Sequence, residues 1–88
     1  MIFHKNLGKT PFERSKTLRQ LIENGDVSLG GNWQLKIYGT LTCRAGKRMK
    51  VENRVFFKDL DAALAGGFRP CAVCLRDDYR IWKQKSRQ

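Results

Sequence analysis

The sequence lacks a long apolar run. No stretch of its 88 residues approaches the roughly 18 consecutive apolar residues that a membrane-spanning helix needs. The first residues, Met1 to Asn6, also lack the apolar segment of a secretory signal peptide. We therefore expect a cytoplasmic protein that does not enter a membrane.

Cysteine and histidine are scarce, with three cysteines and one histidine. An odd number of cysteines argues against a closed disulfide framework and for a reducing compartment. Hydrophobic residues make up 41% of the chain, which is typical of a globular protein. A chain this short has a core that is only marginally stabilising by itself, and a structural metal would supply much of the missing stability. We expect one domain over residues 1–88, and we take it to be a monomer.

Acidic residues are also few. Eight Asp and Glu stand against 18 Lys and Arg, which gives a net charge of +10. An excess of this size predicts a polyanionic partner, with nucleic acid as the first choice. Two alternatives remain open: a basic surface without such a partner, and a structural adaptor that binds an acidic protein.

The local sequence signals predict an α+β fold. Thr10, Pro11 and Glu13 together form a helix-start signal, and Asp59 can cap a second, short helix. Glycines then stop both helices. The expected elements are a helix over 11–24, a strand-like piece over 27–29, a turn at 30–32, strands over 33–38 and 54–57, a short helix over 60–64, and a final helix after Cys74.

The final helix carries an apolar stripe. Leu75, Tyr79 and Trp82 recur at the spacing of one helix face, which predicts that this face packs on the core. We expect residues 83–88 to form a frayed tail. The whole is then a small zinc-stapled domain with an N-terminal helix, a short antiparallel sheet, a short helix, a Cys-x-x-Cys knuckle and a C-terminal helix.

Cys71 and Cys74 carry the strongest chemical signal. Two cysteines separated by two residues can bind one metal ion, because a tight turn brings both sulfurs to one point. Cys43 follows a predicted strand and can fold back onto this pair. We therefore predict a zinc site with these three cysteines as ligands. A redox pair is the alternative, but it calls for a βαβ pattern that the sequence lacks; buried cysteines without a metal are another.

A tetrahedral zinc needs four ligands, and we predict His4 as the fourth. Its neighbours Ile2 and Phe3 can anchor the amino terminus to the core. If His4 does not bind, the fourth position is taken by water, by Asp77 or Asp78, or by nothing. An open position would admit water or a substrate.

Basic residues surround the predicted metal ligands in the sequence. One group lies in the loop after Cys43, and the other lies around the cysteine pair and on the final helix. We expect them to contact the phosphates of DNA with strong salt dependence and little sequence preference. The alternative for the helix is an ordinary solvated face. The predicted contacts are Arg44, Lys47, Arg48, Lys50, Arg69, Arg76 and Arg80.

The residues around the cysteine pair resemble a known family. Ala65 to Cys74, which reads AGGFRPCAVC, resembles the A-G-F-R-P-C-x-x-C signature of the Ada-type metal-binding domain. Glu52 to Phe57 is similar to that family's E-N-V-x-F-[FY] strand with one residue inserted. The resemblance covers about residues 15–76. It implies a zinc held by four cysteines, one of which irreversibly takes a methyl group from a methyl phosphotriester in DNA, after which the affinity for DNA rises.

The resemblance leaves one cysteine unmatched. The family's first two ligands form C-R-P-S-C, and two alignments of this motif are open. In one, Cys43 and Arg44 match its start, so that Cys43 is the methyl acceptor and Lys47 replaces the second ligand. In the other, Cys43 is the second ligand and Gly39 replaces the acceptor.

The loss of one thiolate has an electrostatic consequence. Four thiolates around Zn²⁺ leave two net negative charges, whereas three thiolates and a neutral imidazole leave one. A sulfur on the less negative site is the poorer nucleophile. We therefore expect a structural zinc in a domain that binds DNA or another nucleic acid, with methyl transfer to Cys43 as the enzymatic alternative.

Overall fold

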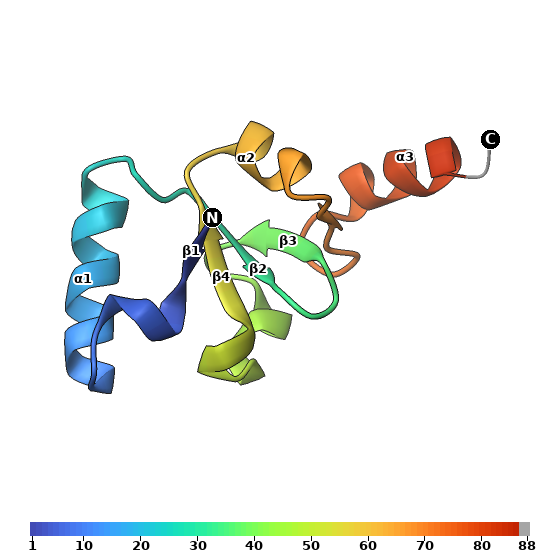
Figure 1. The fold of residues 1–88 in the computed structure, drawn as a ribbon. Coiled ribbons are helices and arrows are strands. Elements are labelled where there is room, and N and C mark those ends of the chain that lie inside the picture. Colours follow the sequence, from blue (N-terminus) through green and yellow to red (C-terminus); the bar gives the residue numbers. More distant parts are fainter. Residues whose placement is uncertain (87–88) are drawn as a thin grey trace.

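In the computed structural model the chain forms a small α+β fold, which confirms the predicted class (Figure 1). The structure describes residues 1–86, without the side chains of Ala45, Lys47 and Ser86. Its helices are α1 (Pro11–Glu23), α2 (Leu60–Ala65) and α3 (Arg76–Ser86), with short 3₁₀ helices η1 (His4–Leu7), η2 (Arg44–Arg48) and η3 (Val51–Asn53). No helix in this described part is long and apolar enough to cross a membrane.

One sheet of five strands organises the fold, in the order β1-β4-β2-β3-β5. The strands are β1 (Ile2–Phe3), β2 (Leu29–Asn32), β3 (Ile37–Thr40), β4 (Arg54–Phe57) and β5 (Arg69–Pro70). Neighbouring strands are antiparallel, except that β3 and β5 run parallel. Parallel strands end at the same edge of a sheet, so the residues that follow β3 and β5 meet there.

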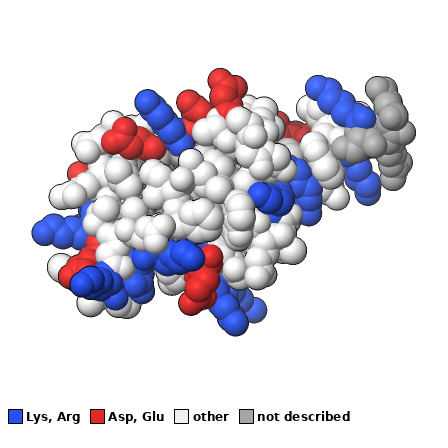
Figure 2. All heavy atoms as spheres, viewed as in Figure 1, with Lys and Arg blue, Asp and Glu red and all other residues white. Residues whose placement is uncertain are grey.

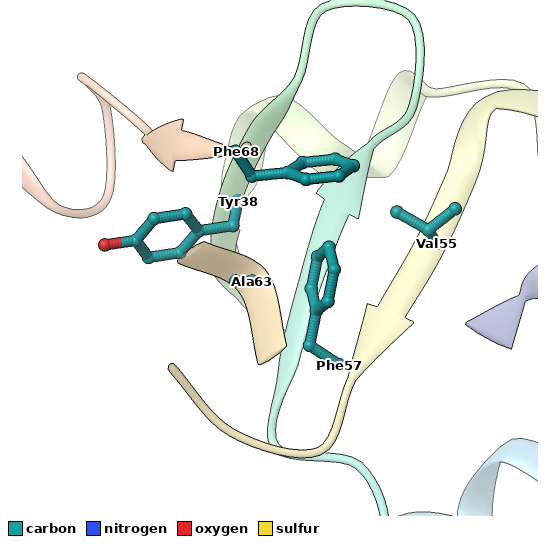
Figure 3. Close-up of a cluster of buried hydrophobic side chains, with 5 residues drawn as sticks. All are labelled: Tyr38, Val55, Phe57, Ala63 and Phe68. Carbon is teal, nitrogen blue, oxygen red and sulfur yellow. The ribbon is translucent and has the colours of Figure 1, made fainter. Parts of the chain in front are cut away.

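The hydrophobic core lies between the sheet and α2 (Figure 3). It consists of Tyr38 from β3, Val55 and Phe57 from β4, Ala63 from α2, and Phe68 just before β5. The rings of Phe57 and Phe68 meet edge to face, with their centroids 4.8 Å apart. This geometry is favourable for two aromatic rings, and it ties the segment before β5 to β4 across the core.

The two predicted helix starts are confirmed. In α1, Thr10 accepts a hydrogen bond from the backbone N–H of Glu13, and the Glu13 carboxylate accepts one from the N–H of Lys9. In α2, Asp59 accepts one from the N–H of Ala62 at 2.9 Å. None of the residues of α1, all of which are described, is buried, and Phe12 is 76% exposed. This helix therefore lies beside the sheet rather than within the core.

The predicted strand over 33–38 and turn at 30–32 are wrong, because the hairpin is shifted along the chain. Gly30 and Gly31 lie within β2, and the turn is formed by residues 33–36. A Cβ on Gly31 would stand 2.8 Å from the Ile37 carbonyl oxygen, so glycine serves close strand packing here. Asn32 makes the turn instead, since its side-chain oxygen accepts a hydrogen bond from the N–H of Leu35.

The final helix departs from the prediction in two ways. It continues to Ser86, so residues 83–86 are helical, while residues 87–88 lie outside the description. It also extends away from the body of the molecule rather than packing its stripe on the core (Figure 1). Tyr79 and Trp82 stack on each other at 5.9 Å instead, and the Arg69 guanidinium lies over both rings at 5.1 and 5.5 Å. Leu75, just before the helix, packs against the core.

Candidate metal centre

The parallel pairing of β3 and β5 brings the three cysteines together. Tyr38 pairs with Pro70, and the N–H of Cys71 donates to the Tyr38 carbonyl at 2.8 Å. Cys43 lies three residues beyond β3, where its N–H donates to the Thr40 carbonyl. Cys74 follows in the turn that leads into α3. Two segments that are far apart in the sequence thus bring their cysteines together at one edge of the sheet.

The geometry of the sulfurs fits a tetrahedral metal. The Sγ atoms of Cys43, Cys71 and Cys74 all lie within 4.8 Å of one another, and those of Cys43 and Cys71 are 3.7 Å apart. A zinc–sulfur bond of about 2.3 Å at the tetrahedral angle places two sulfurs about 3.8 Å apart. The three cysteines are therefore positioned to hold a metal ion. Three converging sulfurs also suit a metal better than a two-cysteine redox pair.

Backbone amides point at the sulfurs and favour their anionic form. The N–H of Thr40 donates to Cys74 Sγ, and that of Val73 donates to Cys71 Sγ, each at 3.4 Å. Burial by itself raises the pKa of the Cys71 thiol. Hydrogen bonds from the backbone N–H groups of Cys74 and Val73 and from the Cys43 and Cys74 side chains outweigh it, so this pKa lies below its ordinary value. A thiolate is the form that binds a metal.

The structure does not bring His4 to these sulfurs. His4 follows β1, and three strand spacings of about 4.8 Å separate β1 from β3, or roughly 14 Å in all. Its ring lies edge-on against Phe56 at 5.3 Å, and its Nδ1 is buried without a hydrogen-bond partner among the described residues. Burial, with Arg54 and Arg14 nearby, lowers the pKa of the imidazole. The amino terminus is thus anchored to the sheet as expected, but at the wrong edge for a ligand.

The carboxylates proposed as substitutes are not grouped with the cysteines either. Asp77 and Asp78 are exposed in the first turn of α3, and no His, Asp or Glu in the described part of the chain joins the three-cysteine group. Asp78 lies toward Tyr38 instead. Burial, and next the charge of Asp78, raises the pKa of the Tyr38 hydroxyl.

Gly39 faces the cysteines. A Cβ on this residue would stand 2.8 Å from Cys74 Sγ, 3.3 Å from Cys71 Cβ and 3.8 Å from Cys43 Cβ. Of the two alignments left open by the sequence, this geometry favours the one in which Cys43 is the second ligand and Gly39 replaces the first. The alternative position, Lys47, has a side chain outside the description.

A pocket of about 360 Å³ opens beside the cysteines, and no motif in the sequence predicts it. Gly39, Cys43 and Cys71 border it on one side. Its walls come from segments far apart in the chain and are largely apolar, with two arginines among them: Leu35, Ile37, Leu41, Met49, Phe56, Val73, Arg54 and Arg69. The Arg54 guanidinium also donates to the Gly46 carbonyl and so ties η2 to β4.

A second hollow, of about 320 Å³, adjoins this pocket. It is lined by Ala72, Tyr79 and three basic residues of α3, and Ala72 also lines the first pocket. We call the basic residues of the two hollows the basic face: Arg54, Arg69, Arg76, Arg80 and Lys83.

The other predicted basic contacts lie on or near η2. Arg44, Arg48 and Lys50 are exposed there. Lys and Arg side chains are visible along α3 in Figure 2, whereas acidic side chains gather over α2. Three of the seven residues predicted to contact phosphates line the two hollows, namely Arg69, Arg76 and Arg80, and Arg54 and Lys83 line them as well.

Comparison with known proteins gives a family. The family model described as the metal binding domain of Ada matches residues 28–77, which is more than half of the chain. The matched segment contains Gly39 and the three cysteines, and it leaves out His4 and α1. The comparisons with curated proteins and with solved structures gave no match.

Proposed function

The chain belongs to the Ada metal-binding family, and from that premise we propose that it is a zinc-stapled module that binds DNA through the basic face. Cys43, Cys71 and Cys74 hold the zinc in this proposal. When bound, the zinc ties the ends of β3 and β5 to the turn before α3, and its role is structural. We place the domain in the cytoplasm as a monomer, because its odd number of cysteines favours a reducing compartment.

One observation supports the DNA-binding proposal: two hollows that share Ala72, one of them bordered by Cys43 and Cys71, are lined by five cationic side chains. Arg54 and Arg69 come from the sheet, whereas Arg76, Arg80 and Lys83 recur along one face of α3. The metal centre lies where these two groups join, so the fold of the cysteine segment decides whether they act together.

Guanidinium groups suit this role. An arginine can donate two parallel hydrogen bonds to one phosphate, and four of the five residues are arginines. Phosphate contacts position a protein on DNA without reading its sequence. The affinity is then expected to fall steeply with salt, with a slope near −0.9 for each phosphate contact on duplex DNA.

Fluorescence anisotropy with a labelled DNA duplex at several salt concentrations tests the proposal. The double substitution Arg76→Gln and Arg80→Gln should weaken binding. It should also make the slope of log affinity against log salt less steep by about the contribution of two phosphate contacts. The matched control, Lys16→Gln with Arg19→Gln, removes the same charge from exposed positions of α1. An equal loss in both double variants would mean that net charge alone attracts the DNA. No binding by the native chain would favour an adaptor for an acidic protein.

Methyl transfer from a DNA phosphotriester to Cys43 is the second candidate, because family membership supports it and Cys43 borders the pocket. Two features speak against it: the site has lost one thiolate, and Gly39 faces the cysteines where the family's acceptor would stand. Mass spectrometry after incubation with methylated DNA discriminates the two candidates. Absence of a methyl adduct on Cys43 would end the enzymatic one.

A further inference from the structure

Glycine at position 39 is not required by the backbone. Gly25 and Gly67 have positive φ angles of 79° and 80° at turns after helices, where glycine is favoured. Gly39 is in a regular strand outside that region of φ, so a residue with a side chain could adopt its conformation. What the glycine permits is the close approach of the cysteines, because a Cβ at this position would lie within 4 Å of atoms of all three and only 2.8 Å from Cys74 Sγ.

Gly39 lies between the cysteines and the pocket, because it contacts the first and lines the second. Gly39, Cys43 and Cys71 all border the pocket, whose volume of about 360 Å³ admits a small organic molecule. The three cysteines can supply three corners of a tetrahedral site, and the described part of the chain adds no His, Asp or Glu to the group. A zinc site with three protein ligands and an accessible fourth position is the arrangement that accepts an outside ligand.

We propose that the fourth coordination position beside Gly39 opens into this pocket and binds a small organic thiol as its thiolate. A metal already held by three thiolates favours a further soft sulfur ligand. The apolar walls, such as Leu35, Met49 and Val73, suit the hydrocarbon body of the thiol. Arg54 and Arg69 offset the negative charge that a fourth thiolate adds.

Binding forms one metal–sulfur bond and breaks the S–H bond of the ligand, whose proton passes to solvent. The affinity should therefore rise with pH until the free thiol is itself ionised. The inference rests on the zinc site of the proposed function and not on DNA binding. A chain that binds metal but no thiol would contradict only this inference, whereas a chain that binds no metal would contradict both.

Cobalt-substituted protein gives a direct readout, because sulfur-to-cobalt charge transfer absorbs in the near ultraviolet. Benzenethiol is titrated into the native chain and into Gly39→Cys, which places a fourth cysteine at the centre. Gly46→Cys is the matched control, since Gly46 also borders the pocket but a Cβ there has no atom within 4 Å. Retention of one cobalt per chain after filtration shows that the thiol does not strip the metal.

The native chain and Gly46→Cys should both show a saturable rise toward the spectrum of Gly39→Cys, and Gly39→Cys should not respond to thiol. No spectral change in the native chain, no retained metal, or an equal change in Gly39→Cys would overturn the proposal. Because a Cβ at position 39 presses on Cys74 Sγ, this variant can fail to fold. X-ray absorption on the native zinc protein then decides, with three sulfurs around the metal before thiol and four after it; an unchanged count would contradict the proposal.

Discussion

The two faces of the sheet are built from different chemistry. Along β4, Val55 and Phe57 enter the hydrophobic core, whereas Arg54 and Phe56 border the pocket. The same alternation occurs in β3, where Tyr38 belongs to the core. Its neighbour Gly39 faces the cysteines. One face is thus covered by packed rings and α2. The other borders the pocket, and the three cysteines lie at its edge.

The two faces therefore differ in how they are stabilised: the core face by apolar packing, and the cysteine edge by the bound metal. Packed apolar side chains stabilise the core face through burial and close contact. At the cysteine edge, three thiol groups converge, and without a metal their negative forms would repel. We infer that the core face persists without zinc and that the cysteine edge does not.

Removal of the metal should have the largest effect. Structural zinc contributes on the order of 10 kcal/mol in small peptides whose folding depends on it. Hydrogen exchange followed with and without a chelator should show early loss of protection at the N–H of Cys71, which bonds Tyr38 across β3 and β5. The N–H of Ser28, which bonds Phe57, should remain protected longer. Equal loss at both sites would show that the metal holds the whole fold and not one edge.

Paired substitutions in β4 compare the two faces within one strand. Phe57→Ala removes a fully buried ring from the core and should lower the free energy of unfolding by about 3–5 kcal/mol. Phe56→Ala should cost less, although this ring is only 4% exposed, because it borders the pocket and the space that it leaves is expected to join that pocket. Urea unfolding of both zinc-loaded variants measures the difference. A larger loss for Phe56→Ala would mean that the pocket face carries more of the stability than the core.

The cap of α2 offers a smaller test on the core face. Asp59→Ala removes the carboxylate that accepts from the Ala62 N–H and should lower the free energy of unfolding by about 1 kcal/mol. Asp61→Ala is the control, since Asp61 is exposed in the first turn and is not the cap. Thermal unfolding should separate the two variants, with zinc binding unaltered in both. Altered zinc binding in Asp59→Ala would show that the two faces are coupled through α2.

The smallest expected effect is the contribution of His4 to the pH dependence of stability. Because the folded-state pKa of His4 is lowered, the unfolded chain binds its proton more readily, and stability falls as the pH drops below about 6.5 toward that lower pKa. His4→Ala should remove this part of the acid sensitivity and leave the zinc affinity unchanged. Unfolding curves between neutral and acid pH, with a competing chelator for zinc affinity, test both points. A weaker zinc affinity would restore His4 as a ligand.

Local signals in the sequence predicted the features that local chemistry decides. Thr10 and Asp59 predicted their helices because a cap is formed within one turn. The predicted position of the hairpin is wrong because glycine is typical both of turns and of strands that pack closely, and Gly31 serves the second purpose. His4 shows a similar limit at the metal centre, whereas the family resemblance already names Gly39 as one of two possible positions there. The order of the strands decides which residues lie near the cysteines, and no short sequence motif predicts that order.

X-ray absorption at the zinc edge, on the native chain and on His4→Ala, tests the central claim most directly. The account predicts one zinc in each, with three sulfurs at about 2.3 Å and the same spectrum in both. A fourth sulfur, no zinc, or an imidazole signal that disappears in His4→Ala would contradict it.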